Sequence, residues 1–196
     1  MFWGSRGRGL DIKLKAMVLA AGLGTRLGSL TREIPKPMLR IGEHPMLALI
    51  LAQLKRHGFD EVMINLHFRP ELIRDYFQDG KHLGIRLAYS DEPQLLGTAG
   101  AIKKVAGWFG GVEPFLIQYG DVVTDQDLTL LLERHRSRNA LCTLLVHRRN
   151  RSNSILCLDG EDRILRFLER PTEAQRVGVD SEYVNSGLCM ASPELL

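Results

Sequence analysis

The sequence predicts an α/β domain with a largely parallel sheet, and three observations carry that prediction. Short apolar runs typical of strands alternate with runs whose apolar residues recur at helical spacing. A glycine-rich loop follows the first of these strands directly. Polar residues then follow several later strands, at the carboxyl ends where sheets of this kind bind their ligands.

The first half of the chain alternates most regularly. Residues 46–57 form an expected helix, because apolar residues recur there every three or four positions and Gly58 follows as a natural stop. Pro70 is a favourable first residue for a second helix over residues 71–77. The remaining elements expected here are strands at 16–20, 61–66, 85–89 and 115–118 and a helix at 98–105.

The second half is expected to add further strands, some of them antiparallel. A helix is predicted at 125–135, followed by strands at 141–146, 155–158, 164–168 and 183–190, and residues 192–194 resemble the start of another helix. The three cysteines, Cys142, Cys157 and Cys189, each lie inside an apolar strand-like run, and no C-x-x-C pair occurs. We therefore expect buried free thiols in a reducing compartment.

Composition and charge exclude several classes of protein. With 196 residues, 44% hydrophobic and 25% charged, the chain is long enough for one domain with a sizeable core. The first 15 residues hold four basic residues and one acidic residue, which accounts for the net charge of +3. Residues 1–14 are therefore expected to be a flexible basic leader, and the domain itself gives no basis for binding nucleic acid. Neither a bilayer-spanning run nor a signal peptide is recognisable, which predicts a cytoplasmic protein without a membrane partner.

The segment over residues 17–38, MVLAAGLGTRLGSLTREIPKPM, has the composition of a polyphosphate site. Gly22 and Gly24 leave backbone amides bare enough to approach a phosphate chain. Arg26 offers a planar fork of donors, and Lys36, held between two prolines, offers a point charge. A plain strand-to-helix turn is the alternative that the glycines alone leave open. The Walker pattern does not fit, since no lysine follows the glycines at the Walker spacing. The dinucleotide fingerprint does not fit either, since the third glycine comes one position late.

The full string resembles the signature of the sugar-1-phosphate nucleotidylyltransferase family, G-x-G-T-R-[LM] followed by P-K-[PA]. Within that family the chain is most similar to mannose-1-phosphate guanylyltransferases, with N-acetylmuramate-1-phosphate uridylyltransferases next. The resemblance implies a Rossmann-like three-layer αβα nucleotide-diphospho-sugar transferase fold with a mixed, mainly parallel sheet. It also implies that an NTP and a sugar 1-phosphate, with GTP and mannose 1-phosphate as the favoured pair, react to give an NDP-sugar and pyrophosphate.

The resemblance also implies roles for individual residues. Arg26 would hold the departing pyrophosphate, Lys36 would stabilise charge growing at the α-phosphate, and Asp121, in a G-D motif, would coordinate the catalytic Mg²⁺. Capping of the helix that follows is the structural alternative for Asp121. The residues expected to bind the nucleotide are Ala20, Ala21, Gly22, Gly24, Thr25, Glu92, Gly97, Thr98 and Tyr119. Among these, Glu92 would accept from a guanine amine, and Tyr119 stands where many members have Asn or Leu.

Four residues are expected to bind the sugar. Glu169 and Arg170 match the family's F-x-E-K-P, with Arg170 in place of the lysine that reaches the sugar phosphate. Asn185 matches the asparagine of N-[AST]-G, and Ser154 stands where a glycine backbone touches the sugar. A surface salt bridge between Glu169 and Arg170, and a tight packing turn at 97–101, are the structural alternatives.

A second Mg²⁺ aspartate, which the family carries beyond the strand at 183–190, has no counterpart in the sequence. Residues 15–196 are therefore expected to be a C-terminally truncated catalytic domain. The alternative is a catalytically impaired subunit that binds nucleotide or sugar nucleotide and regulates a partner. The expected partners are the two substrates, and the sequence leaves open whether the protein is a homo-oligomer.

Overall fold

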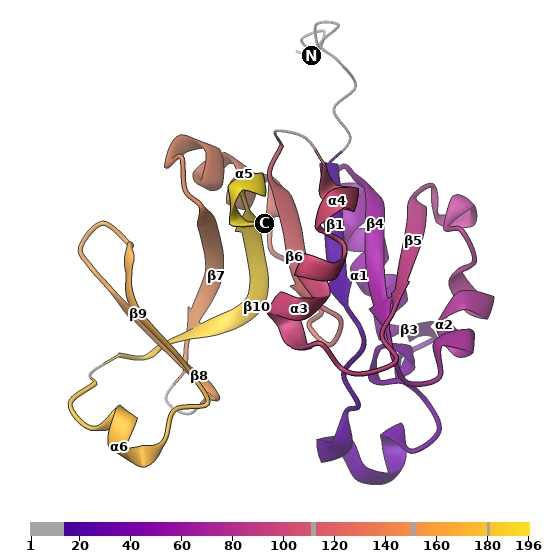
Figure 1. The fold of residues 1–196 in the computed structure, drawn as a ribbon, viewed down its shortest axis with the longest axis horizontal. Coiled ribbons are helices and arrows are strands. Elements are labelled where there is room, and N and C mark those ends of the chain that lie inside the picture. Colours follow the sequence, from indigo (N-terminus) through magenta and orange to yellow (C-terminus); the bar gives the residue numbers. More distant parts are fainter. Residues whose placement is uncertain (1–13, 111–112, 150–151, 180) are drawn as a thin grey trace, which may run out of the picture.

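The computed structural model describes residues 14–110, 113–149, 152–179 and 181–196, and its centre is an eight-stranded sheet (Figure 1). The strands lie in the order β5-β4-β1-β6-β10-β8-β9, and β7 pairs with β10 beside this path. Their bounds are β1 Leu14–Leu19, β4 Phe59–Leu66, β5 Arg86–Asp91, β6 Phe115–Tyr119, β7 Cys142–Arg148, β8 Ser154–Leu158, β9 Ile164–Glu169 and β10 Tyr183–Ala191. A hairpin of β2 (Arg40–Ile41) and β3 (His44–Pro45) makes a separate two-stranded sheet.

The first four strands of this path run parallel. β1 pairs with β4 on one side and with β6 on the other, so that Val18 lies opposite both Ile64 and Gln118. β5 pairs with the outer edge of β4. The chain thus builds outward from β1 in one direction and then returns to the other side of β1 with β6. Such a reversal leaves a crevice at the carboxyl ends of the two central strands, which is the usual ligand site of an open α/β sheet.

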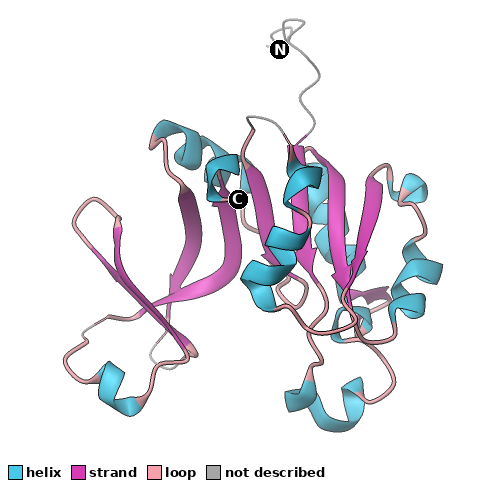
Figure 2. Cartoon of the chain, in the orientation of Figure 1, coloured by secondary structure: helices cyan, strands magenta, loops and turns pink. Residues whose placement is uncertain are grey.

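Helices cover both faces of the sheet (Figure 2). On one face α1 (Met46–Arg56), α2 (Pro70–Phe77) and α5 (Leu128–Ser137) pack in the larger apolar cluster, and on the other α3 (Gly97–Lys104) and α4 (Ala106–Phe109) pack in the smaller one. The side chains of β1 alternate between the two clusters, with Val18 in the first and Met17 in the second. The predicted three-layer αβα arrangement is therefore confirmed.

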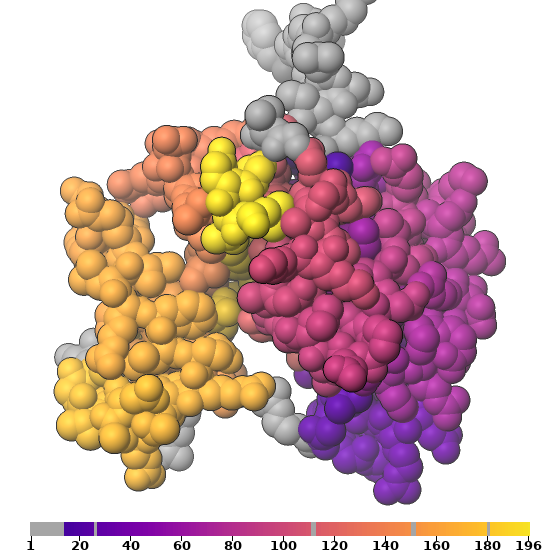
Figure 3. Space-filling model, viewed as in Figure 1, coloured from indigo at the N-terminus to yellow at the C-terminus, as the bar shows by residue number. Residues whose placement is uncertain are grey.

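Beyond β6 the sheet becomes antiparallel. β10 pairs with β6, β7 and β8, and its register with β7 shifts between Asn185 and Cys189. β9 pairs only with β8 among the described strands, and most of its residues are exposed. Figure 3 shows that β8, β9 and the short helix α6 (Glu173–Arg176) form an arm that stands apart from the body over part of its height.

The predicted helices and strands all overlap observed elements, and the differences lie at their ends. The helix expected at 125–135 begins only at Leu128, because the Asp127 side chain accepts from the amides of Thr129 and Leu130 and caps it there. The sequence did not predict the 3₁₀ helices η1 (Thr25–Thr31), η2 (Lys36–Met38) and η3 (Lys81–Leu83), and the helix start expected at 192–194 is the 3₁₀ helix η4 (Pro193–Leu195).

The three cysteines are free thiols, as expected, but the prediction that they are buried is wrong. Cys142 is exposed, and Cys157 and Cys189 are half-buried, because the antiparallel strands that carry them are covered less completely than the parallel ones. Residues 1–13 of the predicted leader lie outside the described residues, and Leu14 is the first residue of β1. Within the described part of the chain, no helix has the length and apolar character needed to cross a bilayer.

Candidate functional site

A cavity of about 450 Å³ lies at the carboxyl ends of β1, β4 and β6. These strand ends are at the lower edge of the sheet in Figure 1. Its walls come from segments far apart in the chain, which meet where the strand order reverses between β1 and β6. The predicted site residues that line it are Ala20, Ala21, Gly22, Gly24, Thr25, Lys36, Glu92, Gly97, Thr98, Tyr119, Asp121 and Arg170.

The glycine loop folds back on itself at Gly24. The backbone of Gly24 is left-handed, with φ of 65°, and a Cβ there would lie 3.0 Å from Thr31 Cγ2 and 3.2 Å from Lys36 Cβ. The Thr31 hydroxyl donates to the Gly24 carbonyl at 2.9 Å. A residue with a side chain would therefore push Lys36 away from the loop, so glycine at this position keeps the lysine against the predicted phosphate-binding amides.

Asp121 lies on the same wall of the cavity as the glycine loop because β1 and β6 approach each other closely at their carboxyl ends. The amide of Gly120 donates to the Leu19 carbonyl at 2.9 Å, and a Cβ at Gly120 would lie 2.9 Å from that same oxygen. This contact joins the carboxyl ends of β1 and β6 and sets Asp121 beside the loop. There the Lys36 ammonium group donates to the Asp121 carboxylate, with 24% and 33% of the two side chains exposed.

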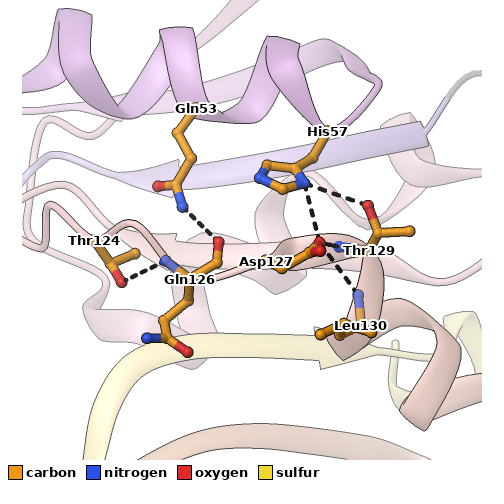
Figure 4. Close-up of polar contacts among 7 residues, drawn as sticks. All are labelled: Gln53, His57, Thr124, Gln126, Asp127, Thr129 and Leu130. Atoms are coloured by element: carbon orange, nitrogen blue, oxygen red, sulfur yellow. Dashed lines mark hydrogen bonds and ion pairs between the residues drawn. The ribbon is translucent and has the colours of Figure 1, made fainter.

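The segment between Asp121 and α5 is clamped to α1 (Figure 4). The Gln53 side chain donates to the Gln126 carbonyl at 2.9 Å, and His57 Nδ1 lies 3.4 Å from Asp127 Oδ1. Amides of the first turn of α5 donate to Asp127 and hold the pKa of that carboxyl below its usual range. Because α1 follows Lys36 in the chain and the bonded segment follows Asp121, these contacts connect the surroundings of the two residues. Lys36 and Asp121 are therefore positioned by contacts other than their own ion pair.

Asn65 also lines the cavity, and the sequence analysis did not identify it. Its Oδ1 accepts from the Ala20 amide at 2.7 Å, and its Nδ2 donates to Glu92 Oε1 at 2.8 Å. The other Glu92 oxygen accepts from the Leu96 amide at 3.1 Å. The position of Asn65 near the carboxyl end of an apolar strand was a signal that could have found it.

The first turn of α3 forms the opposite border of the cavity. Gly97 and Thr98 are the first two residues of the helix and line the cavity directly. The amides of a first helical turn have no partner within the helix and attract anionic groups. The cavity is thus bordered by two amide-rich segments, the glycine loop at 20–25 and the start of α3 at 96–98, with Lys36 and Asp121 on the wall beside the loop.

The structure does not bring all the predicted sugar-binding residues to this cavity. Arg170 lines it, whereas Ser154, Glu169 and Asn185 are not among the described residues that do. Ser154 is buried, and its hydroxyl accepts from the Asn185 amide at 2.9 Å, while the Asn185 side chain accepts from the Gly187 amide at 2.9 Å. Both polar groups therefore help to shape β10 where its register shifts.

Arg26 follows Thr25 in η1, and its side chain falls outside what the structure describes. Within the described residues, no three His, Cys, Asp or Glu side chains gather as a metal site. Asp121 nevertheless presents a partly exposed carboxylate to the cavity. Proteins commonly hold Mg²⁺ through one or two carboxylates together with substrate phosphates, so this residue fits an ion that arrives with a nucleotide.

Several known proteins are similar in sequence to this chain. UTP–glucose-1-phosphate uridylyltransferase of Synechocystis sp. is 33% identical over 197 residues, which cover 93% of this chain and 50% of that protein. Mannose-1-phosphate guanylyltransferase of Mycobacterium tuberculosis is 36% identical over 172 residues, which cover 85% and 48%. The chain therefore spans about half the length of the curated relatives it matches.

The fold and the family agree with the resemblance seen in the glycine loop. The solved structure of UDP-glucose pyrophosphorylase in complex with UDP-glucose superposes with a TM-score of 0.78 at 19% identity, covering 93% of this chain and 77% of that one, so the two share a fold. The family model described as nucleotidyl transferase matches residues 15–196. Because that match extends over nearly the whole chain, the protein belongs to the nucleotidyl transferase family.

Proposed function

We propose that this cavity transfers a nucleotidyl group from an NTP to a sugar 1-phosphate. An oxygen of the sugar phosphate attacks the α-phosphorus of the NTP and forms a new P–O bond. The bond from the α-phosphorus to the bridging oxygen breaks, and pyrophosphate leaves with the electron pair. The observation that carries the proposal is the Lys36–Asp121 pair, a cation and an anion on one wall of a cavity bordered by two amide-rich segments.

The chain's own groups contribute positioning and charge. The bare amides around Gly22 and Gly24 bind the β- and γ-phosphates, and Arg26 in the same loop holds the departing pyrophosphate. Lys36 stabilises the negative charge that grows at the α-phosphate during attack, which is the larger part of catalysis in reactions of this kind. Arg170, on the cavity wall, binds the phosphate of the sugar 1-phosphate.

Asp121 would hold the cofactor, which we propose is Mg²⁺. When bound, the ion supplies positive charge that neutralises the phosphate oxygens and orients them. Asp121 exchanges its contact with Lys36 for this role, which frees the ammonium group to bind the α-phosphate.

GTP and mannose 1-phosphate are the proposed substrates. The motifs of the chain resemble those of mannose-1-phosphate guanylyltransferases, and a relative that is 36% identical carries that name. UTP and glucose 1-phosphate are the competing pair, since a relative that is 33% identical over 93% of this chain is named for them.

The test is pyrophosphate release in the presence of Mg²⁺, with each of the four NTPs set against mannose, glucose, N-acetylmuramate and heptose 1-phosphates. We expect release from one pair and its loss in Asp121→Ala. Asp60→Ala is the matched control, because Asp60 is a partly exposed carboxylate that pairs with Lys55 outside the cavity. A protein that still binds Mg²⁺–NTP but releases no pyrophosphate with any of these substrate pairs would contradict the proposal.

A second candidate is a subunit that binds nucleotide or sugar nucleotide without turnover and regulates a partner. One observation favours it: the Ser154 and Asn185 groups expected to bind the sugar are engaged in bonds within β8 and β10. The same grid separates the two candidates. Nucleotide binding without pyrophosphate release from any pair supports the regulatory subunit.

A further inference from the structure

Three hydrogen bonds in series connect the two amide-rich segments of the cavity. The Ala20 amide, at the start of the glycine loop, donates to Asn65 Oδ1 at 2.7 Å. Asn65 Nδ2 donates to Glu92 Oε1 at 2.8 Å. Glu92 Oε2 in turn accepts from the Leu96 amide, immediately before α3, at 3.1 Å. The series crosses the carboxyl ends of β1, β4 and β5.

The backbone partners of the Asn65 and Glu92 side chains determine which side-chain atoms face which. Because the Ala20 and Leu96 amides can only donate, an oxygen of Asn65 and an oxygen of Glu92 must face them. The Asn65 nitrogen is therefore left to face the second Glu92 oxygen. Asn65 is 4% exposed and Glu92 is 2% exposed, so a group that lost its partner here would be both buried and unsatisfied.

The backbone of Glu92 is held as firmly as its side chain. Its amide donates to the Leu66 carbonyl at 2.7 Å, and its carbonyl lies 2.6 Å from His67 Nδ1. Each carboxyl oxygen of Glu92 accepts a hydrogen bond from the protein, and the residue borders the cavity with almost no exposed surface. These contacts support a positioning role in place of the base-reading role that the resemblance implies.

We propose that Asn65 and Glu92 are positioning residues that fix the spacing of the glycine loop and the start of α3 and couple their conformations. This role rests on the proposed function in so far as the two segments bind one nucleotide. Loss of either side chain then loosens both segments, because each amide is anchored through the same pair. The pair contributes to the binding of every NTP and does not select among the bases.

This positioning role can be tested by exchanging the donor and the acceptor of the hydrogen bond between Asn65 and Glu92. In Glu92→Gln the side-chain oxygen must still accept from Leu96, so two NH₂ groups face each other. In Asn65→Asp the NH₂ donor is replaced by a second carboxyl oxygen, so two acceptors face each other. The double variant Asn65→Asp/Glu92→Gln restores all three bonds with the middle donor and acceptor exchanged, at unchanged net charge.

Two measurements are made on all variants: the dissociation constants of the four Mg²⁺–NTPs, and amide hydrogen exchange at Ala20 and Leu96. Each single variant is expected to weaken binding of all four NTPs by about tenfold, which corresponds to one unsatisfied buried group. Each is also expected to speed exchange at both amides. The double variant is expected to recover both properties. Glu61→Gln is the control, since it makes the same change at a buried glutamate at the other end of β4.

Several results would overturn the role. A change in the preference for one base in Glu92→Gln, without recovery in the double variant, would make Glu92 a base-reading residue. If the single variants keep the wild-type dissociation constants for the NTPs and the wild-type exchange rates at Ala20 and Leu96, Asn65 and Glu92 do not position the two segments. If the wild-type protein binds no NTP, the proposed function fails. The coupling is then decided by exchange alone: it stands if Glu92→Gln speeds exchange at Ala20 and fails if it does not.

Discussion

Lys36 and Asp121 form an ion pair in the cavity although 85 residues separate them in the chain. Lys36 is the first residue of η2 and packs against Gly24. Asp121 follows β6, whose carboxyl end is hydrogen-bonded to the end of β1. Each residue is thus held by its own set of backbone contacts. The pair is a consequence of that positioning, so it can separate without unfolding either segment.

Lys36→Ala is expected to lower the rate of pyrophosphate release by about a hundredfold to a thousandfold, as is typical for the loss of one group that stabilises transition-state charge. The fold should survive, because the side chain is partly exposed and its pair with Asp121 adds little to stability. The measurement is the turnover number at saturating substrates, together with a thermal melt.

Lys55→Ala is the matched control for that change. Lys55 also pairs with an aspartate, Asp60, at 2.6 Å, and lies at the end of α1 away from the cavity lining. Its turnover number should equal that of the wild type. Near-normal turnover by Lys36→Ala would contradict the role proposed for the lysine.

Gly120→Ala is expected to lower the free energy of unfolding by about 1–3 kcal/mol, the usual cost of forcing extra volume into a packed position. The added Cβ would lie 2.9 Å from the Leu19 carbonyl and 3.2 Å from Ala20 Cα, so β1 and β6 must separate at their carboxyl ends. Since Asp121 is the next residue, Mg²⁺–NTP binding should weaken as well. Denaturant unfolding and titration with nucleotide measure the two effects.

Gly160→Ala provides the comparison, because a Cβ at Gly160 meets nothing within 4 Å. It should bind nucleotide and unfold nearly as the wild type does. Equal behaviour of the two alanine variants would show that the ends of β1 and β6 tolerate separation, and the account of how Asp121 is positioned would then be wrong.

The sequence predicted the parts of the cavity that local patterns encode. Gly24, Lys36 and Asp121 could be found because glycines, prolines and a strand-terminal aspartate mark turns and carboxyl ends, and parallel strands bring such ends together. Asn65, near the carboxyl end of an apolar strand, carries a weaker signal of the same kind, and its hydrogen-bond partners could not be predicted. It appears as one polar residue in an apolar run, and its partner amide at Ala20 lies 45 residues away.

The antiparallel half was harder to predict in detail. The strands at Ser154 and Asn185 were predicted, but the shift of register in β10 that turns their polar groups toward each other depends on pairing between distant segments. A motif gives the residue types in such a region and not their partners. The sugar-binding roles of Ser154, Glu169 and Asn185 therefore stay predictions.

Cys142 and Cys189 are expected to form a disulfide when the protein is treated with a low-molecular-weight disulfide, which is reduced to two thiols as the two protein thiols are oxidised. Their sulfurs lie 2.8 Å apart on the adjacent strands β7 and β10. A hydrogen bond from Cys189 lowers the pKa of the exposed Cys142 thiol, which favours the reactive thiolate. Thiol titration and peptide mass mapping should show the loss of two thiols.

Cys157→Ser is expected to leave that reaction unchanged, and Cys142→Ser to abolish it. Cys157 is also half-buried, but it lies on β8 and has no sulfur neighbour among the described residues. A mixed disulfide at Cys142 alone, with Cys189 still titrating as a thiol, would mean that the two strands cannot bring the sulfurs to bonding distance.

His135 is expected to make the fold less stable as the pH falls below about 6.5, the ordinary pKa of histidine. The residue is 1% exposed, with Nδ1 2.9 Å from the Thr143 hydroxyl and Nε2 2.9 Å from the Ser192 hydroxyl. Burial, reinforced by the charge of Arg136, lowers its pKa in the folded state. The unfolded chain then binds the proton more readily, so stability declines from the unfolded pKa downward, by at most about 1.4 kcal/mol per pH unit.

The measurement that isolates this residue compares denaturant unfolding of the wild type and of His135→Gln between about pH 8 and pH 5, the range over which an unperturbed histidine titrates. The variant loses some stability at pH 8 but should show a shallower decline toward low pH, because the titrating group is gone. His82→Gln, at an exposed histidine, should keep the wild-type slope. Identical slopes for the wild type and His135→Gln would mean that a group other than this histidine, which connects α5 to β7 and Ser192, carries the pH dependence.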